Sequence, residues 1–467
     1  MDSAGLRTRA RSSGGNSDQT SETGTSTVFQ SSPANSREIP SFTVDLSAKP
    51  GHRYDHISTQ LLPHIKRAKL THMFDDLIDS ILPGLVGNMA KRFAPMLLRR
   101  VYSDEENAEL VGIARDTQLP MYLLVAFNVL LDMLMGCTSG GVKVEEKDEK
   151  GVWRSRMVHF RTLDWGMDPL REIVVELNYV RSPKGPVVAT TVGYFGYVGV
   201  LTGVRKGLSM SLNFRPRHDD STLKKRISFR HHQLMVVLGL RPSISSVLRR
   251  YLLNEPQSCP SHKSKGQTDL TAKDVSFPET ERKKKEKPSN PTAFNIHTIM
   301  TELSTCPSTS AYLIFCTPQS IFILEKDNNK CFARTSDGFL TAYNHDAVDE
   351  KDPLALAETA RQLSAQKRAA TTGMEEIVEF SCDRKRVLDR IHDRCVKRHR
   401  KRFGRHDNGD AVGMEDVLKF LNDRDRWIVN EETHYAVVMD PKSGDVVWRR
   451  AYEVVRESDS DVEEPGA

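Results

Sequence analysis

The sequence predicts an α+β fold in which two mostly antiparallel sheets are covered by helices on each side. Three patterns lead to this prediction. Apolar residues recur at helical spacing between residues 56 and 136, apolar and polar residues alternate between 137 and 214, and further helical and alternating patterns begin at residue 294. Alternation is typical of strands, and a period of 3.6 residues is typical of helices. Helices and antiparallel strands in separate runs favour a layered sandwich.

The composition indicates a folded core with disordered additions. The chain has 467 residues, 38% of them hydrophobic, and a formal net charge of +5. The length suffices for a large core, whereas the low hydrophobic content is typical of chains with disordered segments. A charge of this size does not by itself indicate nucleic acid, so we expect no nucleic-acid partner.

Changes in composition divide the chain into four parts. Segments rich in Ser, Thr, Gly and Asn, or in Lys and Pro, are predicted to be disordered because they have too few apolar residues to form a core. The parts are a disordered tail at 1–40, a mainly helical region at 41–136, a core at 137–454 with a disordered insertion at 255–291 and a helical insertion at 352–405, and an acidic tail at 455–467.

The region before residue 137 should supply helices and one strand. Ser103 and Glu106 are spaced as a capping box, which predicts a helix from there to about Asp116. Pro120 suits the first turn of the next helix, which is apolar almost all round and therefore buried. The other expected elements are a strand at 42–46 and helices at 56–69 and 73–100, the latter broken near Pro83-Gly84.

From residue 137 onward, the alternation predicts hairpins interrupted by helices. Turn residues such as Ser182-Pro183-Lys184-Gly185 separate the alternating runs. We expect strands at 137–146, 152–160, 173–180, 187–194, 208–214, 312–316, 320–325, 331–343, 435–439 and 446–449, and helices at 231–253, 294–303, 352–370, 383–402 and 414–421.

No membrane-spanning or secretory segment is predicted. The most apolar run, Met121 to Gly136, has 16 residues and contains Asn128 and Asp132. A membrane-spanning helix needs about 20 apolar residues. The N-terminus lacks the apolar stretch of a signal peptide. We therefore expect a cytoplasmic location, and peripheral contact with a membrane stays open.

Cys137 is the candidate nucleophile because it stands where the apolar helix gives way to the first alternating run. Cysteine attacks as the thiolate and needs a base. His159 is the nearest histidine in sequence. The other base would be the α-amino group of Cys137 itself, which exists only if the Gly136–Cys137 bond is cut. Glycine before the cysteine permits the strained backbone of such a cleavage.

Arg161 and Asp164 follow at a predicted turn beside Cys137, where the hairpin would return both to the thiol. The carboxylate would hold a protonated amine, and the guanidinium would bind an anionic oxygen or orient the carboxylate. An alternative interpretation stays open at this point. In it, Cys137 is a small buried hydrophobic residue and the other two side chains form a surface ion pair.

The order of motifs resembles one enzyme family. The segments Cys137–Ser139, His159–Gly166, Gly196–Gly203 and Gly207–Asn213 are similar to those of the acid ceramidase and N-acylethanolamine acid amidase family, whose members are N-terminal-nucleophile amidases related to choloylglycine hydrolases. The segment Asp116–Asn128 resembles the end of the family's small N-terminal subunit. The resemblance covers residues 42–250 well and 293–450 more loosely.

The resemblance implies a four-layer αββα sandwich and a chain that cuts itself before Cys137. The thiol would then attack the amide carbonyl of an N-acyl lipid, either ceramide or an N-acylethanolamine, and the freed amine would move the proton. Asp164 would position that amine, Arg161 would support the site, and Asn344 would help to form the oxyanion hole. This assignment leaves His159 as a structural strand residue.

The family also has a second arginine after that asparagine, and the best match here is Arg384, with Arg386 as the alternative. Trp165 and Tyr197 are expected to contact the substrate. We expect no cofactor and no metal, because the remaining cysteines lack the paired spacing of a zinc site.

The basic run Lys397–Arg402 admits three interpretations, namely a solvated helix face, a nuclear-localisation or nucleic-acid patch, and attraction to anionic lipid headgroups. An alternative function follows from it. The chain would then be a catalytically inactive relative that binds partners through its basic disordered segments.

Overall fold

The computed structural model describes residues 36–81, 84–130, 136–219, 221–255, 294–348, 374–403, 410–421 and 428–453. These residues belong to one unit, residues 33–467. The predicted tail up to residue 35, the insertion from 256 to 291, the helix at 352–370 and the acidic tail lie outside the described residues.

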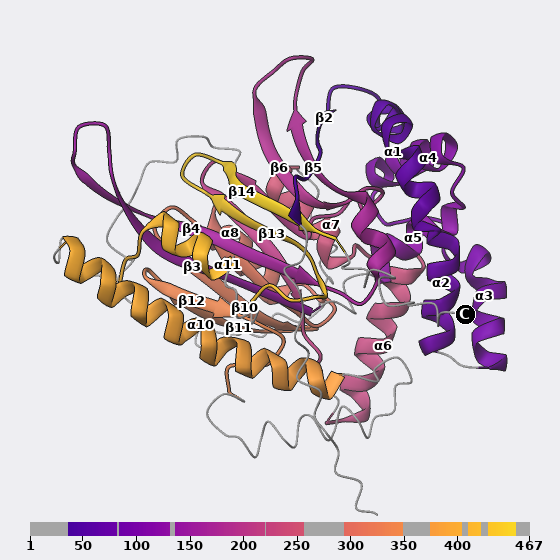
Figure 1. The fold of residues 1–467 in the computed structure, drawn as a ribbon. Coiled ribbons are helices and arrows are strands. Elements are labelled where there is room, and N and C mark those ends of the chain that lie inside the picture. Colours follow the sequence, from indigo (N-terminus) through magenta and orange to yellow (C-terminus); the bar gives the residue numbers. More distant parts are fainter. Residues whose placement is uncertain are drawn as a thin grey trace, which may run out of the picture. The chain divides into compact units, whose positions relative to one another are not determined.

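Two sheets form the centre of the fold (Figure 1). The first has six strands in the order β1 (Ser36–Arg37), β14 (Asp445–Tyr452), β13 (Thr433–Asp440), β4 (Trp153–Asp164), β3 (Gly136–Lys147) and β12 (Phe339–Ala342). The second has eight strands in the order β11 (Lys330–Ser336), β10 (Ile321–Asp327), β9 (Ala311–Cys316), β8 (Leu208–Phe214), β7 (Thr202–Arg205), β6 (Val187–Tyr194), β5 (Val174–Val180) and β2 (Ser41–Asp45).

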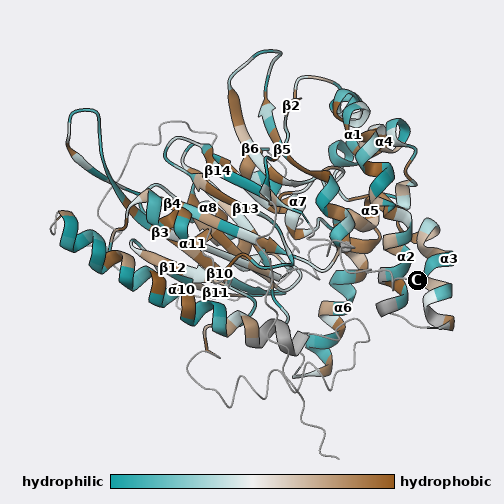
Figure 2. Cartoon of the chain, in the orientation of Figure 1, coloured by the Kyte–Doolittle hydropathy of each residue, from teal (hydrophilic) through white to brown (hydrophobic). Residues whose placement is uncertain are grey.

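Helices cover the outer faces of both sheets. The helix α10 (Met374–Phe403) and α11 (Met414–Leu421) pack on the six-stranded sheet, where Leu388 and Val417 share a buried cluster with Val142 and Phe160. The helix α7 (Ile244–Leu253) packs on the eight-stranded sheet. Figure 2 shows the corresponding division, with hydrophobic residues concentrated in the strands and hydrophilic ones along much of α10. The predicted α+β, four-layer αββα arrangement is confirmed.

The helices before residue 137 gather together (Figure 1). They are α1 (Asp55–Ala68), α2 (Leu70–Ile81), α3 (Leu85–Leu97), α4 (Asp104–Thr117) and α5 (Met121–Leu130). At the start of α4 the Ser103 side chain accepts the Glu106 N–H, so this half of the predicted capping box is present. The Glu106 carboxylate instead accepts the Ser246 hydroxyl of α7. The same helix start therefore also connects the N-terminal helices to the core.

The structure corrects two predicted elements. The helix expected at 231–253 is two helices, α6 (Leu223–Val237) and α7, separated at Gly239 and Pro242. Gly239 has φ +67°, and an added Cβ would lie 2.5 Å from the Arg100 carbonyl oxygen, so only glycine fits this turn. The strand expected at 331–343 is also two, because the chain leaves the eight-stranded sheet after β11 and enters the six-stranded sheet as β12. The remaining helix, α8 (Ile296–Thr305), lies close to its predicted place.

The N-terminal region contributes one edge strand to each sheet. In the stretch predicted as a tail, β1 pairs with β14, so order begins before residue 40. The strand β2 pairs in parallel with β5, whereas the other named pairs of the described strands are antiparallel. Within the described ranges, no helix is long and apolar enough to cross a membrane.

Candidate active site

Cys137 is the second residue of β3, and its thiol faces the eight-stranded sheet. It pairs with Leu163 of β4, and Ser139 pairs with Arg161, so these side chains share one face of the hairpin. Gly136 pairs with Asp164 on the opposite face, which α10 covers. Arg161 and Asp164 are three residues apart within β4 itself, not at a turn, and alternation directs them to opposite faces.

The Arg161 guanidinium holds the thiol from the inter-sheet side. Its Nη2 lies 3.3 Å from Cys137 Sγ and donates to the Leu212 carbonyl at 2.8 Å. Its Nη1 donates to the Leu201 carbonyl and, at 2.7 Å, to the Thr202 hydroxyl. Arg161 and Cys137 are both fully buried. The surface ion pair of the alternative interpretation is therefore absent, since Arg161 lies inside the core.

Two opposing effects act on the pKa of the Cys137 thiol. Burial raises the pKa of Cys137, and the positive charge of Arg161 opposes that rise. A thiol in this state is mostly protonated near neutral pH and needs a base. Cys137 also lines neither of two cavities, of about 360 and 1110 Å³, that open elsewhere on the molecule.

Asp164 is held on the helix-covered face by two partners. Arg384 of α10 donates to one carboxylate oxygen, and the Thr433 hydroxyl donates to the other at 2.7 Å. Burial raises the pKa of Asp164, and the Arg384 charge opposes the rise. An added methyl group on Gly136 would lie 3.4 Å from the Asp164 carbonyl oxygen. Asp164 thus lies directly beside the Gly136–Cys137 peptide bond.

Asn344 joins the two faces at the Cys137 nitrogen. Its Oδ1 accepts the Cys137 N–H at 2.9 Å and lies 3.4 Å from Arg384 Nη2. Its Nδ2 donates to the Phe214 carbonyl at 2.9 Å. In this arrangement the side chain fixes the nitrogen of Cys137, whereas the resemblance assigned Asn344 to the oxyanion hole.

Ser381 of α10 ties this helix to the same loop. The Ser381 hydroxyl accepts the Asn344 N–H at 2.8 Å and lies 2.6 Å from His345 Nδ1. Ser381 and Arg384 are three residues apart, so they lie on one face of the helix. This anchor places Arg384 against Asp164. Arg386 points away, with 62% of its side chain exposed, and pairs with Asp383.

His159 is not in contact with the thiol. Its two ring nitrogens lie 3.0 and 2.9 Å from the hydroxyls of Ser209 and Ser211 on β8. Burial lowers its pKa to about 3, so the ring is neutral. The histidine therefore connects the two sheets, in agreement with its predicted structural role.

Trp165 and Tyr197 lie in the same buried cluster as Cys137. The ring of Trp165 is 6.3 Å from that of Tyr194, and Tyr197 meets Phe127 edge-on at 5.8 Å. His434 Nε2 donates to the Trp165 carbonyl at 2.8 Å, so Nδ1 accepts the Tyr194 hydroxyl at 2.7 Å. The rings of Trp165, Tyr194 and Tyr197 belong to the large buried cluster that also contains Cys137. Within the described ranges, no group of three His, Cys, Asp or Glu side chains could hold a metal ion.

Several supporting residues were missed because they come from distant segments. Thr433 and Ser381 carry no motif that would connect them with Cys137. Leu201 and Thr202 did lie in the segment Gly196–Gly203 that carries the family resemblance, but no role was assigned to either residue. An added Cβ at Gly199 would lie 2.6 Å from the Ser245 hydroxyl, so the glycine permits α7 to approach this segment.

Comparison with known proteins gives a consistent picture. The family model for the beta subunit of N-acylethanolamine-hydrolyzing acid amidase matches residues 37–102. Acid ceramidase from Heterocephalus glaber is 28% identical over 206 residues, and that from Bos taurus is 29% identical over 220 residues. Each match covers 41% of this chain and 49% of the relative, so the chain spans about half the length of the curated relatives it matches. A solved structure of the Caenorhabditis elegans N-acylethanolamine-hydrolyzing acid amidase ortholog aligns with a TM-score of 0.35 at 16% identity, covering 66% of this chain and 93% of that one.

Proposed function

Because this chain is similar to acid ceramidase and to the beta subunit of N-acylethanolamine-hydrolyzing acid amidase, we propose that it is an amidohydrolase that cleaves the amide bond of N-acyl lipids. The observation that carries the proposal is the convergence of separate segments on one cysteine. Cys137, Arg161 and Asp164 come from a hairpin, Asn344 from a loop after β12, and Arg384 from α10. Burying charged side chains around a thiol costs folding free energy. Such a group therefore has no evident structural purpose.

The first step of the proposal is self-cleavage before Cys137. The thiol adds to the Gly136 carbonyl carbon, and the carbon–nitrogen bond breaks to leave a thioester and a free amine on Cys137. Water then hydrolyses the thioester, releasing the Gly136 carboxylate and the thiol. Asp164 supports this step because it is beside Gly136, and Asn344 supports it by fixing the departing nitrogen at 2.9 Å.

In the amidase reaction, the new α-amino group is the base for the thiol. It takes the thiol proton and gives it to the amine that leaves the substrate, while the acyl group stays on sulfur until water removes it. Arg161 lowers the cost of negative charge at the sulfur in a dry site. The Asn344 amide, next to the nucleophile, is the proposed donor to the oxyanion once substrate is bound.

The substrates that fit the proposal are ceramide and N-acylethanolamines, the classes suggested by the relatives' names. The rings of Trp165, Tyr194 and Tyr197 belong to the same buried cluster as Cys137, and apolar rings of this kind suit an acyl chain. Peripheral contact with a membrane has separate support in α3. Its exposed residues Leu85, Met89, Phe93 and Met96 recur at helical spacing beside basic residues, which is typical of helices lying on a lipid surface.

The test is to purify the full chain and its Cys137→Ala variant. The unaltered chain should yield two fragments by denaturing electrophoresis, the larger beginning at Cys137 by mass spectrometry, and should hydrolyse ceramide or an N-acylethanolamine. Cys137→Ala should stay intact and inactive. Cys316→Ala is the matched control, because Cys316 is equally buried but lies in β9, away from the candidate site.

An uncut chain that behaves like Cys137→Ala on every N-acyl lipid tried would contradict the proposal. It would favour the alternative of an inactive relative that binds partners through its basic segments.

A further inference from the structure

Two buried hydroxyl groups lie beside the candidate active site without a hydrogen-bond partner. Thr138 of β3 and Thr162 of β4 stand directly opposite each other in the hairpin, and both residues are 0% exposed. Neither hydroxyl oxygen forms a hydrogen bond within the part of the chain that the structure describes. Buried hydroxyls in folded proteins are normally hydrogen-bonded to the protein or to an ordered water, so this pair points to a bound water.

The shape of threonine alone does not account for the pair. A β-branched residue suits a strand, but valine has the same shape and buries no polar atom. Each hydroxyl has one hydrogen to donate and two lone pairs. Residues directly opposite each other in a hairpin have Cβ atoms about 4.5–5.5 Å apart, a spacing at which one water molecule can bridge two hydroxyls.

The pair shares its face of the hairpin with the groups around the Gly136–Cys137 peptide bond. Side chains alternate along a strand, so Thr162 and Asp164 point to the same side, which α10 covers. Thr138 points to that side too, whereas the Cys137 thiol faces the eight-stranded sheet. Arg384 of α10 adds a third buried atom, Nε, that forms no hydrogen bond with the described residues.

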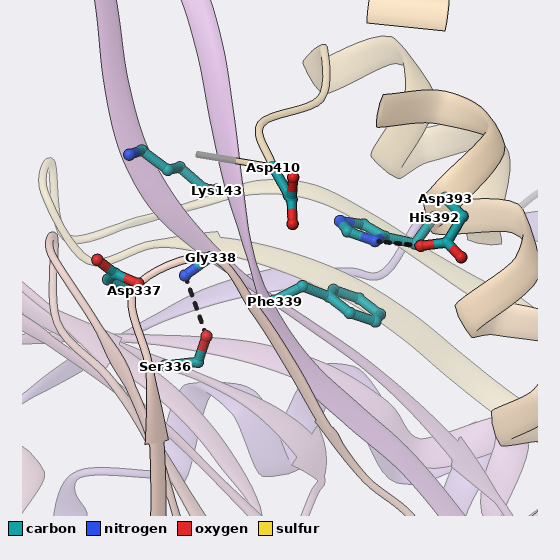
Figure 3. A pocket seen from close by; sticks show the side chains of 8 residues that line it. All are labelled: Lys143, Ser336, Asp337, Gly338, Phe339, His392, Asp393 and Asp410. Carbon is teal, nitrogen blue, oxygen red and sulfur yellow. Dashed lines mark hydrogen bonds and ion pairs between the residues drawn. The ribbon is translucent and has the colours of Figure 1, made fainter. Parts of the chain in front are cut away.

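The space between β3 and α10 changes along its length. Near Lys143 and His392 it opens into a cavity of about 360 Å³ (Figure 3). Neither Thr138 nor Thr162 lines that cavity. Thr138 precedes Lys143 by five residues on β3 (143 − 138), about 17 Å along the strand. The two hydroxyls therefore lie in a closed part of this interface, where a bound water is shielded from bulk solvent.

We propose that Thr138 and Thr162 hold the water molecule that hydrolyses the thioester formed during self-cleavage. The inference rests on the proposed function, because that thioester exists only if the Cys137 thiol adds to the Gly136 carbonyl carbon. The thiol reaches this carbon from the side of the eight-stranded sheet. The two hydroxyls direct water to it from the opposite side, so they are positioning residues for this step.

The step balances with water as the added reactant. The water oxygen bonds to the Gly136 carbonyl carbon while one water proton passes to the Asp164 carboxylate. The carbon–sulfur bond then breaks, its electron pair stays on the Cys137 sulfur, and the sulfur takes the proton from Asp164. The other water proton stays on the new carboxylic acid of Gly136 and is lost when that acid ionises.

The test compares the rate of self-cleavage in the parent chain and in the double variant Thr138→Val/Thr162→Val. Each full chain is synthesised in a cell-free system, and its fragments are followed by denaturing electrophoresis. The double variant should be cut at least about tenfold more slowly, because water no longer has a fixed position. It should accumulate the thioester, which neutral hydroxylamine cleaves. Adding hydroxylamine should therefore restore cutting and leave a hydroxamate on Gly136, detected by mass spectrometry.

Two further variants separate the hydroxyls from the shape of the side chains. Thr138→Ser keeps the hydroxyl and should be cut at the parent rate. Thr341→Val is the matched control, since Thr341 is a buried threonine of β12 that pairs with Gly140, two positions beyond Thr138 on β3. It should also be cut at the parent rate. Valine retains the shape of threonine, so the valine variants should stay folded, which a thermal unfolding curve checks.

Cutting of the double variant at the parent rate would overturn the inference. Slow cutting that hydroxylamine does not restore would overturn it too, because the defect would then precede the thioester. A parent chain that stays uncut, with and without hydroxylamine, would overturn the proposed self-cleavage itself and this inference with it.

Discussion

Two arginines, Arg161 and Arg249, are almost completely buried, yet their surroundings differ in charge. Arg249 forms a two-point ion pair with Glu109, at 2.5 and 2.8 Å, and donates to the Val198 carbonyl. Arg161 donates to two carbonyls, a hydroxyl and the Cys137 thiol, and pairs with no carboxylate of the described residues.

We propose that the difference separates a structural arginine, Arg249, from one that serves chemistry, Arg161. At Arg249, the charges cancel and the pair connects α4 to α7. At Arg161, a positive charge is held next to a sulfur atom without a carboxylate to neutralise it. A buried charge left in this state is costly, and it persists where negative charge develops during a reaction.

Of the variants that test this difference, Glu109→Gln is expected to have the largest effect, on the free energy of unfolding. It leaves Arg249 and Arg53, which also contacts Glu109, without their buried carboxylate. We expect a loss of about 3–5 kcal/mol in the free energy of unfolding, measured by denaturant titration. Glu105→Gln is the control, because Glu105 pairs with Arg53 at the partly exposed rim and should cost under about 1 kcal/mol. Equal losses for the two variants would refute a central role of the Glu109 pair.

Arg161→Met should have the opposite pattern, with a large loss of reaction rate and a small loss of stability. Self-cleavage and amide hydrolysis should slow by a factor of about 10²–10³, the usual effect of losing one electrostatic contact in a reaction site. The free energy of unfolding should change less than in Glu109→Gln, because no ion pair is broken. Cleavage kinetics and denaturant titration on the same preparation measure both. A variant that cleaves at the parent rate but unfolds easily would place Arg161 with Arg249 as structural.

Glu106 makes the α4–α7 connection sensitive to pH. Burial raises its pKa from 4.5 to about 7. Between these values the folded chain holds a proton that the unfolded chain has released, so stability is full below pH 4.5 and falls as pH rises to 7. The shift corresponds to about 3 kcal/mol. Glu106→Gln should flatten this part of the stability–pH profile, measured by denaturant titration at several pH values, and an unchanged slope would remove the assigned role.

The smallest effect is expected from Arg384→Gln. Without the Arg384 charge, the pKa of Asp164 should rise further, since burial already raises it. The carboxylate then protonates at higher pH, so the acid limb of the self-cleavage profile should move upward by about one pH unit. Arg386→Gln, the neighbouring solvent-exposed arginine, should leave the profile in place. A shift in both variants would instead indicate a general change in surface charge.

Local patterns carried much of the fold prediction. The Ser103 cap, the hairpin of the strands expected at 137–146 and 152–160, and the apolar helix after Pro120 each depend on residues close in sequence. They occur as predicted, except that the second strand continues to Asp164. The choice of Arg384 over Arg386 is not local. It depends on Ser381, which binds the Asn344 backbone and rotates one arginine toward Asp164.

Contacts between distant segments were beyond sequence reasoning. The second half of the strand expected at 331–343 belongs to a different sheet, beside β3, where the Gly338 carbonyl accepts the Lys143 N–H at 2.7 Å. Leu201 and Leu212 hold Arg161 through backbone carbonyls, which any residue type supplies. A role carried out by a backbone carbonyl therefore leaves no mark on the type of residue in the sequence.

The two edge strands from the N-terminal region gain a further meaning if the chain is cut before Cys137. The released segment then contains β1 and β2, which complete the six-stranded and eight-stranded sheets, and no cysteine precedes residue 137 to tether it. Its departure would uncover a row of unpaired backbone groups on each sheet. Exposed edges of this kind recruit strands from other molecules. If the cut occurs, the small fragment would protect these edges from self-association, and its removal should make the larger fragment aggregate.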